Sequence, residues 1–194
     1  MKSTQKLLRI AAISALALLS GTTAKAATNS NTATVALSAT VNTKLTVSLS
    51  GATQTWSTAN ANDLIPGNAS NAGNAGITVT TSWVLQPGHT AVALYAYFGS
   101  AIAALTPAVG TTNIPSSAFE IKVGAGAFTP VSGTTAGFGV AGSSLLLQST
   151  VITGANKVSS ATAALTFNIN LTTLPQLPAD TYSGTLNIQA QATP

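Results

Sequence analysis

The sequence feature that most restricts the fold is an alternation of apolar and polar side chains, which recurs in short segments along the chain. Successive side chains of a β-strand point to opposite faces, so an alternating segment forms a strand with one apolar face. The two clearest apolar faces are Ala33, Val35, Leu37, Ala39 and Val41, and then Ala161, Ala163, Leu165, Phe167, Ile169 and Leu171. Beyond residue 26 no segment has helical periodicity, so the sequence predicts an all-β protein.

Residues that favour turns divide this pattern into short pieces. Gly, Asn and Pro accumulate over residues 51–75, 104–117 and 133–143, which we expect to be loops. Strands are expected over residues 32–41, 45–49, 77–85, 90–98, 119–123, around Phe128, and over 145–152, 161–171 and 186–192. About eight or nine short strands separated by turns are typical of a single β-sandwich.

Two of these expected strands have informative faces. The strand over residues 90–98 is apolar on both sides, because Tyr95 and Tyr97 lie opposite Val92 and Leu94. Such a strand is expected to lie in the centre of a sheet or to face a partner. The last strand places Leu186, Ile188 and Ala190 on one apolar face, which is expected to meet a partner.

The first 26 residues have the pattern of a bacterial signal peptide. The basic residues Lys2, Lys6 and Arg9 precede an apolar run over 10–19, and Ala24-Lys25-Ala26 follows. A basic start, a short apolar run and two small residues around one other residue are the features of a cleavable export signal. The apolar run is half of the roughly 20 residues that a membrane-spanning helix needs.

Residues 27–194 are therefore expected to form one exported domain with no membrane span. We expect this domain to pass through the periplasm and to end on the cell surface or outside the cell. The chain contains no cysteine, so neither a disulfide nor a thiolate metal site is available to it.

The distribution of charge excludes one class of partner. The net charge of +4 comes from the expected signal peptide, because the remaining chain has three lysines and three acidic residues. Binding to nucleic acid needs clustered Lys or Arg to neutralise phosphates, and no such cluster is present. A surface with so few charges lacks the repulsion that keeps soluble monomers apart, which favours a protein that lives in an assembly or on a cell surface.

The residues that carry most enzyme chemistry are scarce. The chain has one histidine, His89, in a predicted turn, and three separated carboxylates, Asp63, Glu120 and Asp180. Glycoside hydrolysis needs a pair of carboxylates about 5–10 Å apart, and calcium sites need acidic clusters. Nothing in the spacing indicates either arrangement, so we expect no catalytic residues, no metal and no cofactor.

Aromatic side chains support an alternative function, because flat rings stack on sugar rings. Trp83 lies on an apolar face and is expected in the core. Trp56 lies in the polar stretch Gln54-Thr55-Trp56-Ser57 and is the best candidate for an exposed ligand-binding ring. The alternative function is therefore a secreted module that binds carbohydrate or another surface.

Both ends of the expected domain resemble a known family. Residues 35–41 (VALSATV), continuing to Leu45-Thr46-Val47-Ser48, resemble the mature N-terminus of spore coat protein U-like proteins and archaic chaperone–usher pilins. Residues 177–188 (LPADTYSGTLNI) resemble the last-strand signature of that family. The chain departs from the family pattern in lacking a Cys near Lys44, in having Asp180 in place of the usual Gly, and in lacking an aromatic residue near its end.

This resemblance implies an incomplete immunoglobulin-like sandwich with one open edge, filled by the N-terminal strand of a neighbouring subunit. Mapped onto this chain, the donor strand would lie within residues 27–42, and Ala33, Val35, Leu37, Ala39 and Val41 would enter the neighbour's groove. The implied partners are other copies of the chain, a periplasmic chaperone and an usher. The implied function is that of a non-enzymatic structural subunit of a surface filament or coat. Residues 32–41 could instead form an ordinary first strand of their own domain, and both interpretations follow from the same pattern.

Overall fold

The computed structural model describes residues 34–56, 64–65, 67–135, 137–174 and 177–194. The expected signal peptide, Ala33 and Asp63 lie outside these residues. The chain divides into two units, residues 1–40 and 41–194, and all the strands belong to the second unit. The described residues contain no α-helix, so the predicted all-β class is confirmed.

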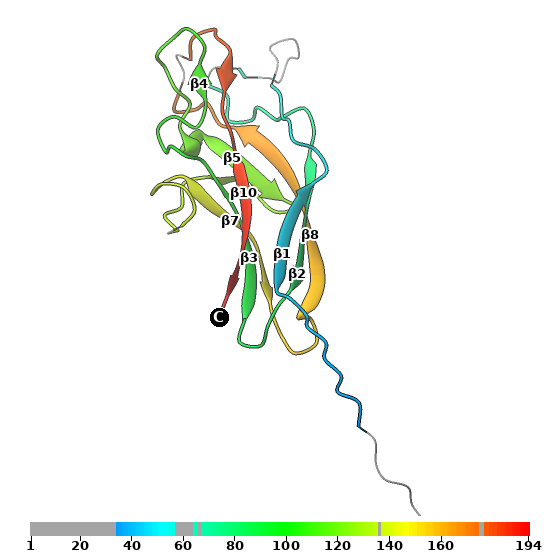
Figure 1. Ribbon diagram of the computed structural model, residues 1–194. Coiled ribbons are helices and arrows are strands. Elements are labelled where there is room, and N and C mark those ends of the chain that lie inside the picture. Colours follow the sequence, from blue (N-terminus) through cyan, green and yellow to red (C-terminus); the bar gives the residue numbers. More distant parts are fainter. Residues whose placement is uncertain (1–33, 57–63, 66, 136, 175–176) are drawn as a thin grey trace, which may run out of the picture. The chain divides into compact units, whose positions relative to one another are not determined.

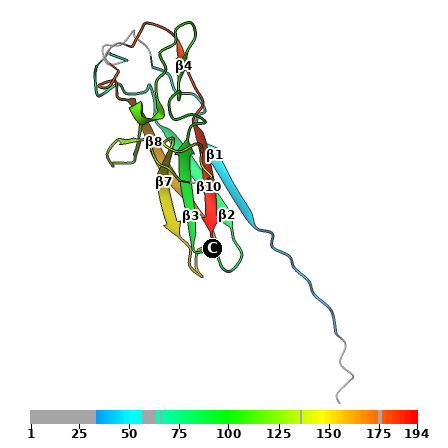
Figure 2. The same cartoon turned by 90° about the vertical axis from the view of Figure 1, so that its left-hand side faces the viewer.

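Two antiparallel sheets form the layers of the sandwich (Figure 1). The larger sheet has the order β1 (Lys44–Leu49), β2 (Ile77–Val84), β8 (Val158–Ile169), β5 (Phe119–Val123) and β6 (Thr129–Pro130). The smaller sheet has the order β10 (Asn187–Thr193), β3 (Ala91–Tyr97) and β7 (Ser144–Val151). A third pair joins β4 (Thr106–Pro107) to β9 (Tyr182–Ser183), and η2 (Ser116–Ala118) is a single 3-10 turn. Figure 2 shows β7, β3 and β10 of the smaller sheet side by side.

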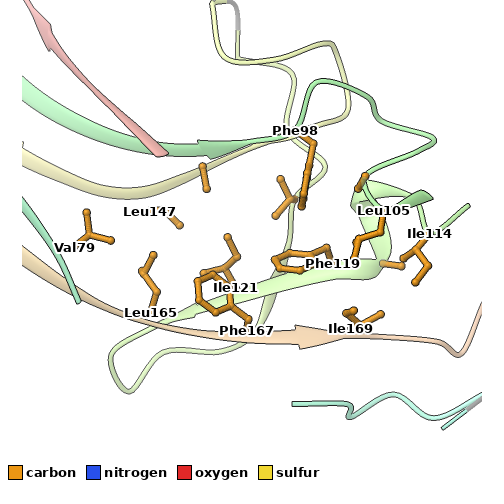
Figure 3. Packing of buried hydrophobic residues seen from close by; sticks show 14 of the residues in the cluster. Val79, Phe98, Leu105, Ile114, Phe119, Ile121, Leu147, Leu165, Phe167 and Ile169 are labelled. Carbon is orange, nitrogen blue, oxygen red and sulfur yellow. The ribbon is translucent and has the colours of Figure 1, made fainter. Parts of the chain in front are cut away.

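The alternation in β8 shows why these segments form strands around one core. Leu165 and Phe167 are each 1% exposed, whereas Thr162 and Ala164 between the inward positions are exposed. The register continues this division across the sheet, since buried Val79 of β2 lies opposite buried Ala163. The inward side chains of both sheets meet in the layer between them (Figure 3).

Both faces of β3 are covered within the chain, as its sequence predicts for a central strand. β3 lies between β10 and β7, and its inward residue Leu94 is 2% exposed. On the outer face, the ring of Tyr95 stacks on Phe138 with 4.0 Å between ring centroids. Phe138 comes from the glycine-rich loop over residues 133–143 and is itself buried, so this loop folds over the outer face of β3.

The two sides of the sandwich differ in how they are closed. On one side an isolated bridge between Gly133 and Ser144 connects the loop after β6 to the start of β7. On the other side β1 and β10 are the edge strands of their sheets, and no described strand lies between them. Their inward side chains, such as Val47 and Ile188, are only partly buried although they pack against the core.

The sequence-based strand boundaries hold for the long strands and differ elsewhere. Residues 34–43 form no strand, although their alternation predicts one, and β1 begins at Lys44. Alternation gives a segment an apolar face, but a strand also needs a neighbouring strand for its backbone hydrogen bonds. The strand expected around Phe128 is reduced to Thr129–Pro130, because a proline can donate no ladder hydrogen bond.

We predict that Phe167→Ala lowers the free energy of unfolding by about 3–5 kcal/mol, because it leaves a cavity in the layer between the sheets. Thr162→Ala on the exposed face of the same strand is the matched control and should change it by less than about 0.5 kcal/mol. Urea denaturation of both variants measures the difference. Equal effects of the two substitutions would contradict the burial pattern assigned to β8.

Candidate functional site

The open side of the sandwich contains a cavity of about 640 Å³, which we call the edge cavity. Its floor is the hydrophobic core itself, formed by Phe98, Leu105, Ile114, Phe119, Phe167 and Ile169 (Figure 3). These side chains are each less than 10% exposed, so the cavity reaches the centre of the core rather than a shallow surface depression. An apolar cavity at an unpaired sheet edge is a surface suited to an apolar partner.

One flank of the edge cavity is formed by the end of β1 and residues 51–56. Leu49, the last residue of β1, is 44% exposed. Trp56 is half-buried, its indole N–H donates to the carbonyl of Asn71 at 2.9 Å, and its ring meets Phe119 edge-on. The ring of Trp56 thus lines the edge cavity and is less exposed than its polar sequence context predicts, and its role in ligand binding stays a prediction.

The other flank is formed by residues 180–186 and Ile188, which we call the cavity wall. β9 lies within this wall and pairs with β4, which holds the wall on the turn over residues 106–110. At Gly184 the wall passes so close to the backbone of Ala104 that a Cβ atom at this position would overlap the Ala104 carbonyl oxygen. A glycine is therefore required where the wall meets the core.

The carboxylate of Asp180 fastens the cavity wall to this turn. Its Oδ2 accepts hydrogen bonds from the backbone N–H groups of Gly110 at 2.7 Å and Val109 at 3.1 Å. Its Oδ1 accepts from the N–H of Thr181 at 2.7 Å and of Ala108 at 3.2 Å. These hydrogen bonds, the one from Gly110 above all, stabilise the charged form and hold the pKa of Asp180 below its ordinary value.

Tyr182 is the other ionisable side chain in the lining of the edge cavity. Its hydroxyl donates to the carbonyl of Pro178 at 2.9 Å. Burial and, second, the negative charge of Asp180 raise the pKa of Tyr182. The phenol is therefore neutral at neutral pH and serves to hold the loop before β9. His89 does not line this cavity.

The last-strand residues predicted to meet a partner lie at this open side. Leu186, Ile188 and Ala190 pack against the core but remain partly exposed, and Leu186 and Ile188 line the edge cavity. β10 pairs with β3 along one edge, and at its other edge β1 lies close by without pairing to it. Backbone groups on a free strand edge are available to pair with another chain.

The predicted donor residues are solvent-exposed where the structure describes them. The exposed fractions are 82% for Val35, 90% for Leu37 and 74% for Val41, and Ala39 is exposed too. Ala33 lies outside the described residues. Large apolar side chains this exposed at every second position are unusual on a solvated surface and indicate a surface made for contact.

Sequence reasoning singled out only Leu186 and Ile188 of the cavity wall as partner residues. The stretch over residues 177–188 was also recognised for its resemblance to a last strand, but Gly184 within it gave no signal of its tight contact. Among the residues described, no three His, Asp or Glu side chains are grouped so that they could bind a metal ion. No helix in the same residues is long and apolar enough to cross a membrane.

Comparison of the chain with protein-family models, with curated protein sequences and with solved structures gives no significant match. The edge cavity, its wall and the exposed segment before β1 are therefore the features of this chain from which we infer a function.

We predict that Gly184→Ala lowers the free energy of unfolding by about 1–3 kcal/mol, because the new methyl group is forced against the backbone of Ala104. Gly154→Ala is the matched control, since a Cβ atom there meets nothing within 4 Å. Guanidinium denaturation of the two variants measures the effect. If both substitutions are neutral, the cavity wall does not pack as described.

Proposed function

We propose that this protein is a non-enzymatic structural subunit of a bacterial surface filament or coat, in which copies join by strand insertion. The segment over residues 35–41 of one copy would fill the edge cavity of the next and pair with its β10. The observation that carries the proposal is the coexistence, in one chain, of a cavity that opens onto the core and an exposed alternating segment. This arrangement would make the fold an incomplete immunoglobulin-like sandwich of the spore coat U and archaic pilin type.

The chemistry of the segment matches that of the cavity. Val35, Leu37, Ala39 and Val41 form one apolar face, and the floor of the cavity is apolar as well. Burying a Val or Leu side chain contributes about 1.5–3 kcal/mol. Neither residues 34–43 nor β10 contains a charged residue. The inserted strand and the strand it pairs with would therefore bury no charged side chain of their own.

The length of the segment also matches the free edge. Residues 35–41 and β10 are both seven residues long, so a strand formed by the segment would extend along the whole of β10. Addition of a strand to a free sheet edge gains backbone hydrogen bonds, and pockets for alternate side chains give specificity. Both conditions are present at the open side.

The donor in this proposal is a second copy, because residues 34–43 form no strand with their own domain and the shortest hairpin back along β1 has an unfavourable register. A two-residue hairpin at Asn42-Thr43 would pair Val41 with Lys44 and Leu37 with Ser48, and paired residues point to the same face. Lys44, Thr46 and Ser48 lie on the exposed face of β1, so the apolar side chains of the segment would face solvent with them. A segment from another copy has no such constraint.

The proposal includes a periplasmic chaperone and an usher as partners before assembly. An unpaired sheet edge beside an open core is prone to non-specific pairing, and proteins usually protect such edges. A chaperone that covers the edge cavity during export would prevent premature association. The proposed location is the cell surface, reached with the aid of the predicted signal peptide.

We predict that Leu37→Asp abolishes assembly of the exported chain, because strand insertion would place an unpaired carboxylate in the apolar edge cavity. Ser38→Asp is the matched control, since its side chain lies on the opposite face of the segment and would point to solvent. The association constant should fall more than about a hundredfold for the first variant and change little for the second. Light scattering and electron microscopy of the purified chains measure this.

Deletion of residues 27–42 gives a second test of the same proposal. The shortened chain should remain folded, since these residues precede β1, but it should form no multimers with itself and should cap wild-type assemblies. The proposal is wrong if the full exported chain is monomeric at all concentrations, or if the deleted chain assembles as the full chain does.

A further inference from the structure

We propose that Asp180 is a positioning residue, whose carboxylate holds the cavity wall in the place where it receives the inserted strand. This inference rests on the proposed function and adds to it the group that shapes the receiving site.

The cavity wall is fastened to the turn over residues 106–110 mainly through backbone groups. The carbonyl of Thr181 accepts from the N–H of Ala108 at 2.9 Å, and β9 adds the two-residue pairing with β4. The Asp180 carboxylate adds three N–H donors from the same turn, Ala108, Val109 and Gly110. The carboxylate therefore adds to the backbone pairing and is the wall's contact with the N–H groups of Val109 and Gly110.

The geometry at Asp180 requires an anion. Four N–H groups converge on two oxygens, and only an ionised carboxylate can accept from all of them. An asparagine at this position would present an N–H₂ group to the N–H groups of Val109 and Gly110 or of Ala108 and Thr181, which replaces two attractions by two repulsions. The protonated carboxyl group of Asp180 would also present an O–H donor and would accept fewer of these hydrogen bonds.

No cation contributes to this arrangement among the residues that contact it. The turn over 106–110 (TPAVG) contains no ionisable side chain, and in the wall Tyr182 is the ionisable side chain besides Asp180 and titrates well above neutral pH. The convergent N–H groups lower the pKa of Asp180 below 3.8. The fastening is therefore complete at neutral pH and is lost as the pH falls through the lowered pKa of the folded protein.

A fastened wall favours insertion because it is ordered before the partner arrives. If the wall moves freely, ordering it on binding reduces the affinity for the inserted strand. The cost would appear chiefly as faster dissociation, since the inserted side chains themselves are unchanged. Faster dissociation of the inserted strand therefore distinguishes a positioning role of Asp180 from a role in global stability alone.

A peptide-binding experiment tests the inference. The acceptor is the exported chain with Leu37→Asp, which keeps its edge cavity but should not donate its own segment. The probe is a labelled peptide of residues 30–43, acetylated and amidated, which has no ionisable side chain. Adding Asp180→Asn should weaken peptide binding about tenfold at pH 7. In acid the affinity of the parent acceptor should fall as the pH passes the lowered pKa of Asp180, whereas Asp180→Asn should not show this loss.

Glu120→Gln is the matched control, because Glu120 is the other described carboxylate and accepts from Asn168 and Asn170, away from the cavity lining. It should bind the peptide as the parent acceptor does and show the same loss in acid. Amide hydrogen exchange at Val109, Gly110 and residues 181–186 should accelerate in Asp180→Asn and not in Glu120→Gln. If Asp180→Asn does not fold, the pH dependence of peptide affinity in the parent acceptor and in the control still tests whether binding needs the ionised carboxylate.

The outcomes separate the two proposals. Peptide binding at pH 7 that is equal in the parent and in Asp180→Asn, or a parent affinity that does not fall at all in acid, overturns the role of Asp180 and leaves strand insertion standing. Absence of peptide binding by every acceptor overturns the proposed function and this inference with it.

Discussion

The side of the sandwich at β1 and β10 is the constraint on which the rest of this structure depends. A sandwich buries its core only if both sides are closed, and the other side is closed within the chain by the bridge between Gly133 and Ser144. β1 and β10 approach each other without pairing, and the floor of the edge cavity beside them is made of core residues such as Phe119 and Phe167. The domain thus has an unpaired strand edge and a cavity lined by core residues on the same side, and either feature alone would favour a partner.

The low charge of the chain explains how such a surface can work. The two described side-chain carboxylates accept hydrogen bonds from neutral N–H donors. Asp180 accepts from backbone groups, and Glu120 accepts from the amides of Asn168 and Asn170. Charge is therefore used to fix local geometry, while the open side presents apolar groups and backbone. Association between two such uncharged surfaces would depend on shape and on the pairing of strand edges, with little contribution from salt-dependent attraction.

Individual elements show how far sequence reasoning extends. β8 could be predicted almost to its ends, because its alternation continues for many residues and turn residues bound it. The central place of β3 followed from its two apolar faces. Residues 34–43 have equally good alternation and form no strand, because pairing depends on a neighbouring edge that the local sequence does not encode. Trp56 lies in a polar stretch and yet packs edge-on against Phe119, since its burial is set by a contact 63 positions away in the chain.

The sequence by itself determined the all-β class, the faces of the long strands, the scarcity of ionisable groups and the apolar face of the segment before β1. All of these depend on side-chain type and on the two-residue period of a strand, which are local properties. Only the tertiary structure decided that β1 and β10 are unpaired edges of different sheets, that Gly184 fits against Ala104, and that four N–H groups converge on Asp180. These features arise from residues far apart in the chain, and their spacing is fixed only when the two sheets pack together.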